Sequence, residues 1–565
     1  MILVDTNCGK VEVKTITTVN EFGETITATL YKPKTATAEN PAPVLLSNHG
    51  GGDCREQQSS YNVEFARRGY VVISWDASGC GGSEVTSGDA TMGGEAIFAL
   101  MNTLDYVDHN KVITEGHSMG GIYSMTLAQR HQDQVVLQVN IGMNMYGNAD
   151  LGYGFNFALI MGLADESGLS RVDNNIYKLM EADSLKAVFA ITENVVPGKA
   201  YGNFADETGR TVYMPDSIHA YYLVNKETVT NFLEVADKCV PMPIKIDINN
   251  QVWQWKDVGM ALVYAGLVVF MFVIAAMLLD SKLFEGLKLP ELKNVGFEEK
   301  TPKWYIAFAI LAIIPAITYL WGFKNYGKIK FWLMGGSPNG YILWGWATAA
   351  LLLVFFLAFH FIFGKKNGGN ARTYGFATTQ EGNGFSITYI LKAAFYGIAV
   401  VGLTYILYML VYAFTKSGLH ITTFMMLPVQ QFRGWAFVVY FLFQIPYFLL
   451  SGLSARSVNL NNGDKTSAKS MTKSIALGAV INMSLLFVMY LVFVIALGIG
   501  HTNILMNDRL YIAAIAILPL MLSLLAANAV NVYITNKTNS VYAGLFTALL
   551  WSTWLMVGAN AIAIM

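Results

Sequence analysis

Apolar residues follow different patterns in the two halves of the chain. Up to about Val240 they come in short runs separated by Gly, Asn, Asp and charged residues. From Val258 onward they form nearly uncharged blocks of roughly 20 residues, long enough to cross a hydrocarbon core of about 30 Å. The pattern predicts a soluble domain over residues 1–245, a linker over 246–257 and an all-α transmembrane domain over 258–565.

The soluble half alternates between strand and helix patterns. Residues 11–19 and 26–32 alternate apolar and polar positions around a turn, which predicts an antiparallel hairpin. Continuous apolar runs, typical of strands buried on both faces of a parallel sheet, occur at 43–47, 70–75, 112–115, 135–141, 155–163 and 211–214. Helical spacing is found at 57–68, 119–129 and 226–238. We therefore predict a doubly wound, mostly parallel α/β sheet, whose ligands bind at the carboxyl ends of the strands.

The second half is predicted to span a membrane eight times, at residues 258–279, 304–322, 341–363, 393–414, 435–453, 474–498, 510–534 and 541–562. None of these spans contains Asp, Glu, Lys or Arg, the ionisable side chains that ion-coupled carriers usually place at mid-membrane. Their absence from the predicted spans argues weakly against transport.

Charge and cysteine content exclude some classes of protein. The net charge of −1 and the lack of a Lys/Arg-rich cluster give no reason to expect a nucleic-acid partner. The four cysteines have no CxxC or Cys/His spacing, so neither a zinc site nor a redox motif is indicated. We expect free thiols, with a disulfide between Cys54 and Cys80 as the alternative if the domain faces an oxidising compartment.

The sequence Gly116-His117-Ser118-Met119-Gly120 stands between a predicted strand and a predicted helix. This is the context of a GxSxG nucleophile elbow, in which the serine hydroxyl is raised on a sharp turn and small flanking residues avoid a clash. Ser118 is therefore the candidate nucleophile.

A glycine-rich loop, Asn48 to Gly52, follows the strand at 43–47. A hydrolase needs backbone N–H groups at this place, pointing at the developing oxyanion. We expect an oxyanion hole formed by the backbone of Gly50 and Gly51 together with the N–H of Met119.

The base and the acid follow from their order along the chain. Between Ser118 and the membrane half there are two histidines, and His131 lies about 20 Å down the helix from the serine. His219, in the loop after the last strand, is therefore the predicted base. Asp165 is the predicted acid because it ends the preceding strand, and Glu166 and Asp150 are the alternatives.

Several motifs in the first half of the chain resemble those of a known protein family. The N-terminal hairpin ending in LYKP, the HGGG loop, D-x-x-G-x-G-G-S after the next strand, GHSMGG, and GLADE before a final His loop resemble the dienelactone-hydrolase-like and esterase branch of the α/β-hydrolase superfamily. The resemblance covers roughly residues 10 to 240 and is specific at the superfamily level. It implies carboxylic-ester hydrolysis through an acyl-serine intermediate, without metal or organic cofactor. The long stretch between Asp165 and His219 departs from the pattern, and we expect residues 167–209 to cover the site.

Three functions remain open at this stage. The first is a membrane-embedded serine hydrolase acting on an ester, with acylated or lipid-like esters among the candidates. The second is a transporter or sensor whose hydrolase-like domain binds a ligand, and the third is an acyltransferase or serine peptidase with the same triad. A small-molecule or lipid-like ester and membrane lipid are the expected partners.

Two features of the sequence give conflicting predictions for the side of the membrane on which the soluble domain lies. The loops on the far side carry fourteen Lys and Arg residues against eight on the side of the soluble domain, which favours an external hydrolase in the cell membrane. No cleavable signal peptide is recognisable in residues 1–14, which favours a cytoplasmic one or an upstream signal anchor.

Overall fold

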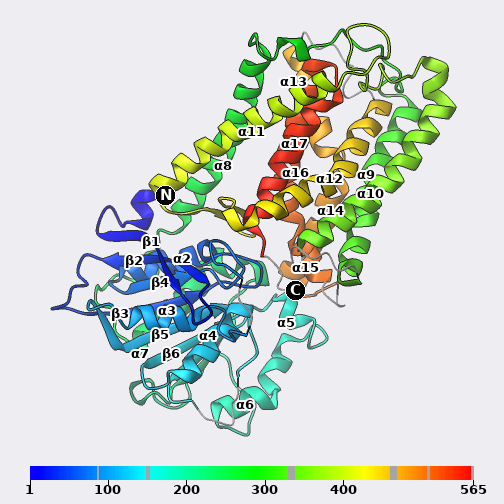
Figure 1. Cartoon of the computed structure of the whole chain (residues 1–565). Coiled ribbons are helices and arrows are strands. Elements are labelled where there is room, and N and C mark those ends of the chain that lie inside the picture. Colours follow the sequence, from blue (N-terminus) through cyan, green and yellow to red (C-terminus); the bar gives the residue numbers. More distant parts are fainter. Residues whose placement is uncertain (86–87, 148–152, 329–336, 459–466, 506–509, 562–565) are drawn as a thin grey trace.

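The computed structural model describes residues 1–85, 88–147, 153–328, 337–458, 467–505 and 510–561. Its first domain is built on an eight-stranded sheet with the order β1-β2-β4-β3-β5-β6-β7-β8 (Figure 1). The strands are β1 (Val11–Val19), β2 (Thr25–Pro33), β3 (Ala42–Asn48), β4 (Val71–Trp75), β5 (Val107–His117), β6 (Val135–Ile141), β7 (Asn156–Ile160) and β8 (Arg210–Tyr213). The β1–β2 and β2–β4 pairs are antiparallel, and the pairs from β4 across to β8 are parallel. The predicted hairpin and mostly parallel sheet are confirmed.

Both faces of the sheet are covered because its strands are apolar on both sides. Along β3, Val44 and Leu46 lie in one buried cluster and Leu45 in the other, as the alternation of side chains along a strand requires. The first cluster packs against α3 (Gly94–Met101) and α4 (Met119–Arg130). The second packs against α2 (Ser59–Arg67) and α7 (Lys226–Cys239). This is a doubly wound arrangement.

The second domain is helical. Its helices are α8 (Gln254–Leu279), α9 (Pro302–Asn325), α10 (Ser337–Phe359), α11 (Ile387–Thr415), α12 (Gly434–Ser454), α13 (Ala468–Val480), α14 (Ser484–Gly500), α15 (Leu510–Ile515), α16 (Ile517–Thr538) and α17 (Val541–Ala559). A short hairpin of β9 (Leu419–Ile421) and β10 (Phe424–Met426) connects α11 to α12. Among the described residues, seven helices are long and apolar enough to cross a membrane, or eight spans result if α13 and α14, bent by 54°, form one.

Both ends of the helical domain contact the first domain. At its start, Lys256 Nζ lies 2.8 Å from Asp5 Oδ1 of the first domain. At its end, Arg433 donates to the carbonyl of Val557 at 2.9 Å and to the carbonyl of Gly79 in the first domain at 3.1 Å. Figure 1 shows the N-terminus near the junction of the domains. A helical domain that begins and ends near the first domain agrees with the even number of crossings that the sequence predicts, with α13 and α14 as one bent span.

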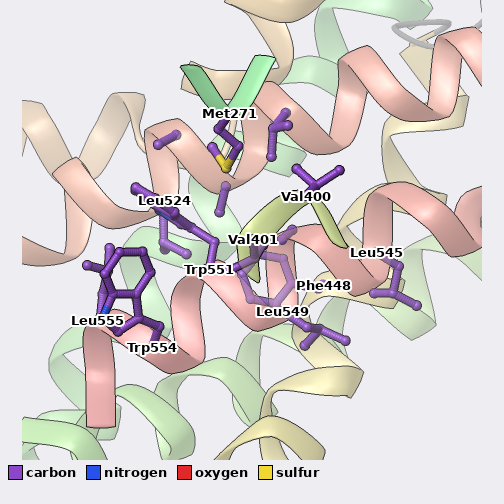
Figure 2. Close-up of a cluster of buried hydrophobic side chains, with 14 of the residues drawn as sticks. Met271, Val400, Val401, Phe448, Leu524, Leu545, Leu549, Trp551, Trp554 and Leu555 are labelled. Atoms are coloured by element: carbon purple, nitrogen blue, oxygen red, sulfur yellow. The ribbon is translucent and has the colours of Figure 1, made fainter. Parts of the chain in front are cut away.

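Helix α17 forms the centre of the helical domain. Of its most apolar stretch, 83% is buried by other helices, against 22% for α8 at the periphery. Figure 2 shows Leu549, Trp551 and Trp554 of α17 in the buried cluster together with Leu524 of α16. The indole of Trp554 donates to the carbonyl of Leu427 just after β10, at 3.0 Å. The last helix is thereby held against the hairpin at the domain junction.

Candidate active site

The loops predicted to carry the chemistry meet because the strands before them end in register. Asn48 at the end of β3 pairs with Gly116 of β5, and Ile141 of β6 pairs with His117. Ile160 at the end of β7 pairs with both Ile141 and Tyr213. The oxyanion loop, the nucleophile, the acid and the base therefore start from one edge of the sheet.

Ser118 occupies the turn between β5 and α4 with a backbone φ of 52° and ψ of −123°. A positive φ is strained for a residue with a side chain, so the surroundings must fix this conformation. The neighbouring glycines allow it: a Cβ on Gly116 would lie 2.1 Å from the carbonyl carbon of Gly120. A Cβ on Gly120 would lie 2.5 Å from the carbonyl oxygen of Asn48. The predicted elbow is formed.

Ser118, His219 and Asp165 form a continuous chain of contacts. The Ser118 Oγ lies 2.9 Å from His219 Nε2, and His219 Nδ1 lies 2.9 Å from Asp165 Oδ2. A carboxylate can only accept, so Nδ1 carries the proton and Nε2 is the acceptor for the serine hydroxyl. His131, which we expected to be too distant, instead contacts Glu95 at 2.8 Å.

Asp165 is held from several sides. The Gly168 N–H donates to its Oδ1 at 2.7 Å, and the Tyr222 hydroxyl donates to its Oδ2 at 2.5 Å. The adjacent Glu166 accepts from the backbone N–H of His219 at 2.8 Å, so its carboxylate contacts the backbone of the histidine instead of the ring. Asp150, the other alternative acid, lies outside the described residues. Of the described candidates, Asp165 is the one bonded to the imidazole.

Burial and neighbouring charge set the protonation of these groups. Burial raises the pKa of Asp165, but the contact with His219 and the donated hydrogen bonds outweigh it and lower that pKa below its usual value. Burial lowers the pKa of His219, yet Asp165 and then Glu166 raise it above its usual value overall. Burial raises the pKa of Glu166 to about 7. The imidazolium form of His219 is therefore favoured by Asp165 and, near and above pH 7 where it is ionised, by Glu166.

The oxyanion loop differs from the prediction at one residue. The N–H of Gly50 already donates to Gln57 Oε1 at 2.7 Å, so it is not directed at a substrate. Gly51 packs directly on the residue after the nucleophile, since a Cβ there would lie 2.5 Å from Met119 Sδ. Met119 is the first residue of α4, where the backbone N–H has no partner within the helix. Gly51 and Met119 are thus the backbone donors that remain from the predicted set.

A chain of hydrogen bonds that the sequence did not reveal holds this loop. Gln57 Nε2 donates to Asp53 Oδ2 at 2.7 Å, which fixes its other amide atom as the acceptor for Gly50. Asp53 Oδ1 in turn lies 2.9 Å from His420 Nε2 on β9 of the helical domain. The second domain is therefore connected to the oxyanion loop through two side chains.

The nucleophile opens into a cavity of about 340 Å³ between the two domains. Ser118, His219 and Gly51 line one end, and residues of β10, α10, α15, α16 and α17 line the rest. From the range 167–209, expected to cover the site, Ser167 and Arg171 reach the cavity. Helix α6 (Asp183–Phe189) lies on the side of the first domain away from the helices (Figure 1). The cover over Ser118 is thus provided mainly by the helical domain.

The cysteines and metal-ligating side chains add no second centre to the part of the chain that the structure describes. Cys54 and Cys80 are buried free thiols, and Cys8 and Cys239 are also free. No group of three or more His, Cys, Asp or Glu side chains that could hold a metal ion occurs among the described residues.

Comparison with known proteins agrees with the fold of the first domain. Residues 43–166 match the family model described as alpha/beta hydrolase fold. A solved S-formylglutathione hydrolase from Agrobacterium tumefaciens is 17% identical, with a TM-score of 0.31, covering 41% of this chain and 96% of that one. A dienelactone hydrolase-like promiscuous phosphotriesterase from metagenomic libraries is 14% identical, with a TM-score of 0.27, covering 38% and 85%. No curated protein sequence matches the chain.

The sheet order and the family match define the class of the first domain, which is an α/β-hydrolase. The whole chain joins this hydrolase to a helical domain that has the length and apolarity of a multi-pass membrane protein.

Proposed function

We propose that the protein is a membrane-embedded serine hydrolase that cleaves a carboxylic ester through an acyl-serine intermediate. The observation that carries this proposal is the unbroken contact from Ser118 Oγ through His219 to Asp165, with both distances at 2.9 Å. The strained elbow and the Gly51 and Met119 N–H groups beside it support the same chemistry. A domain that only binds a ligand has no need of such an arrangement.

The proposed reaction proceeds in two halves. His219 Nε2 takes the Ser118 proton while Oγ attacks the ester carbonyl, and the N–H groups of Gly51 and Met119 stabilise the oxyanion. The intermediate collapses, and His219 returns its proton to the departing alcohol. Water then attacks the acyl-serine with His219 again as the base, which releases the carboxylic acid and restores Ser118. Asp165 orients the imidazole and stabilises its positive charge throughout.

Labelling with a fluorophosphonate probe tests the nucleophile directly. We expect the intact protein in membranes to be labelled, and the Ser118→Ala variant to lose the label because the Ser118 hydroxyl is the one in contact with Nε2 of His219, the proposed base. Ser184→Ala, on the exposed surface of α6, is the matched control and should be labelled like the wild type. Absence of labelling in well-folded protein, or labelling that survives Ser118→Ala, would contradict the proposal.

We also propose that the hydrolase domain lies outside the cell membrane. The proposal rests on the excess of Lys and Arg in the loops on the far side of the helices, fourteen against eight. Lys330, Lys465 and Arg509, which enter these counts, lie outside the described residues.

A further inference from the structure

The cavity above Ser118 continues into the helical domain along two helix faces. One face is formed by the end of α15 and the start of α16, with Ile512, Ile515, Ala516, Pro519, Leu520 and Ser523 in the cavity wall. The other belongs to α17, with Ser552, Leu555, Met556 and Ala559 in the wall. Steps of three and four residues place each set on a single side of its helix. The two faces therefore form a channel that starts at the nucleophile.

The chemistry of this channel is apolar. Apart from Ser523 and Ser552, the residues of both faces are hydrocarbon, sulfur or proline side chains. Ser552 already donates to Gln444 Oε1 at 2.6 Å, so its hydroxyl is used within the helical domain. The charged groups in the cavity wall, Asp53, His219 and Arg171, belong to the hydrolase domain. The two helix faces are thus mainly apolar, while the helical domain adds polar groups elsewhere in the cavity wall, at Ser337, Tyr341, Thr423, Tyr511 and Asn560.

We propose that this channel binds the acyl chain of the substrate, which makes the substrate an ester of a medium-length, unbranched fatty acid. The inference rests on the proposed function of Ser118. The α17 face from Ala559 to Ser552 extends about 10 Å along the helix axis at about 1.5 Å per residue. The cavity volume of about 340 Å³ is near the lower end of the range for ligand sites, so it suits one chain.

The order of the reaction assigns the channel to the acyl group instead of the alcohol. The acyl group stays bonded to Ser118 while the alcohol leaves and water enters. Met119 is 44% exposed and Arg171 is exposed, and both line the hydrolase end of the cavity. Exchange of alcohol for water at that end leaves the buried channel occupied by the acyl chain.

A series of p-nitrophenyl esters with acetyl, butyryl, octanoyl and lauroyl groups measures this preference. Each buried methylene raises kcat/KM about fourfold, so the wild type should prefer octanoate over acetate. Ala559→Phe places a large side chain in the channel wall, and we expect the octanoate-to-acetate ratio to fall about tenfold or more. Met556→Ala enlarges the channel and should move the preference toward laurate. Ala265→Phe, the same substitution on the exposed face of α8, is the matched control and should keep the wild-type ratio.

Opposite shifts in the two channel variants would support the inference, because misfolding lowers the rate with every ester alike. Ratios equal to wild type in both variants, with fluorophosphonate labelling retained, would overturn the channel and leave the proposed function standing.

Binding to a variant that cannot react distinguishes a failure of the channel proposal from a failure of the proposed function. Octanoate binding to the Ser118→Ala variant is measured by the displacement of a fluorescent fatty acid. The affinity should weaken about tenfold when Ala559→Phe is added and stay unchanged when Ala265→Phe is added. That result supports the channel even if the wild type is not labelled, whereas equal binding in both double variants overturns it.

Discussion

At the residue scale, the two carboxylates around His219 have different contacts and different effects. Asp165 bonds to the imidazole ring, so it controls both the tautomer and the charge of the base. Glu166 bonds to the backbone N–H of the same residue, so it acts on the imidazolium through its charge alone. Both carboxylates raise the pKa of His219, against the effect of burial. Because the reaction needs neutral His219, the activity must fall as pH decreases through that raised pKa.

Glu166→Gln is expected to shift the acid limb of the pH profile of kcat/KM to lower pH with a small loss of maximal rate. The substitution keeps an acceptor for the His219 N–H. It removes the partial charge that Glu166, with its pKa of about 7, carries near neutral pH, so the pKa of His219 falls by a small amount. Asp165→Asn should shift the limb in the same direction and lower kcat by about 10⁴-fold, because the tautomer is lost as well. An unchanged acid limb in Glu166→Gln, measured with an ester that the wild type cleaves, would contradict this account.

The sequence predicted the three residues of the proposed triad, which the structure brings into contact, because their signals are local. Ser118 lies in a motif with fixed spacing, and Asp165 and His219 follow strand ends in the order that the reaction requires. Tyr222 and Gln57 were missed, since each is one ordinary polar residue whose partner is brought near by the fold: Tyr222 contacts Asp165 across 57 positions of the chain. The side-chain contact of Gln57 also explains why Gly50, predicted as an oxyanion donor, has its N–H occupied.

At the scale of elements, the β9–β10 hairpin is the part of the helical domain that contacts the oxyanion loop. His420 on β9 lies 2.9 Å from Asp53, and the N–H of Gly418 just before it donates to Glu56 at 3.0 Å. Burial lowers the pKa of His420, but Asp53 outweighs burial and raises it. His420 is therefore connected through Asp53 and Gln57 to the loop that contains Gly51. We infer that His420 is a positioning residue for this loop.

His420→Ala should lower kcat about tenfold and leave KM nearly unchanged, because a displaced oxyanion loop weakens contacts made in the transition state. His420→Gln keeps an N–H that can donate to Asp53 and should recover most of the lost rate. His109→Gln, a histidine of β5 remote from the site, is the control and should behave as wild type. An equal loss of kcat in the alanine and glutamine variants, or a change confined to KM, would show that His420 does not position the oxyanion loop.

The long elements were predictable, and the short ones at the junction were not. Apolar blocks predicted the described helices that are long and apolar enough to cross a membrane, since the length of such a block alone indicates a span. Strands β9 and β10 have three residues each, too few for an alternating pattern to be recognised. The bend between α13 and α14 depends on packing between distant segments, and so does the position of α15, α16 and α17 over Ser118. The sequence therefore predicted each domain but not the cavity between them.

At the scale of the whole molecule, the hydrolase is fixed to one end of the helical domain by polar contacts around the site. Asn503, after α14, donates to the carbonyl of Glu166 at 2.9 Å, next to the acid. Arg55, after the oxyanion loop, donates to the Tyr412 hydroxyl at the end of α11 at 3.1 Å. Arg433, before α12, donates to Gly79. Because these contacts lie on several sides of Ser118, both domains contribute to the structure of the candidate active site.

The eight crossings that the sequence predicts would place every loop on a defined side, so one labelling experiment tests on which side the hydrolase domain lies. Cys8 is an exposed free thiol on the hydrolase side, and Asn367 is exposed beyond the end of α10, on the far side. With the hydrolase outside, a membrane-impermeant maleimide should label Cys8 in intact cells. Asn367→Cys, in a Cys8→Ser and Cys239→Ser background, should be labelled only after permeabilisation, and that background without Asn367→Cys is the control. The reverse pattern would place Ser118 in the cytoplasm. The far-side excess of Lys and Arg would then be an exception to the rule that such residues stay inside.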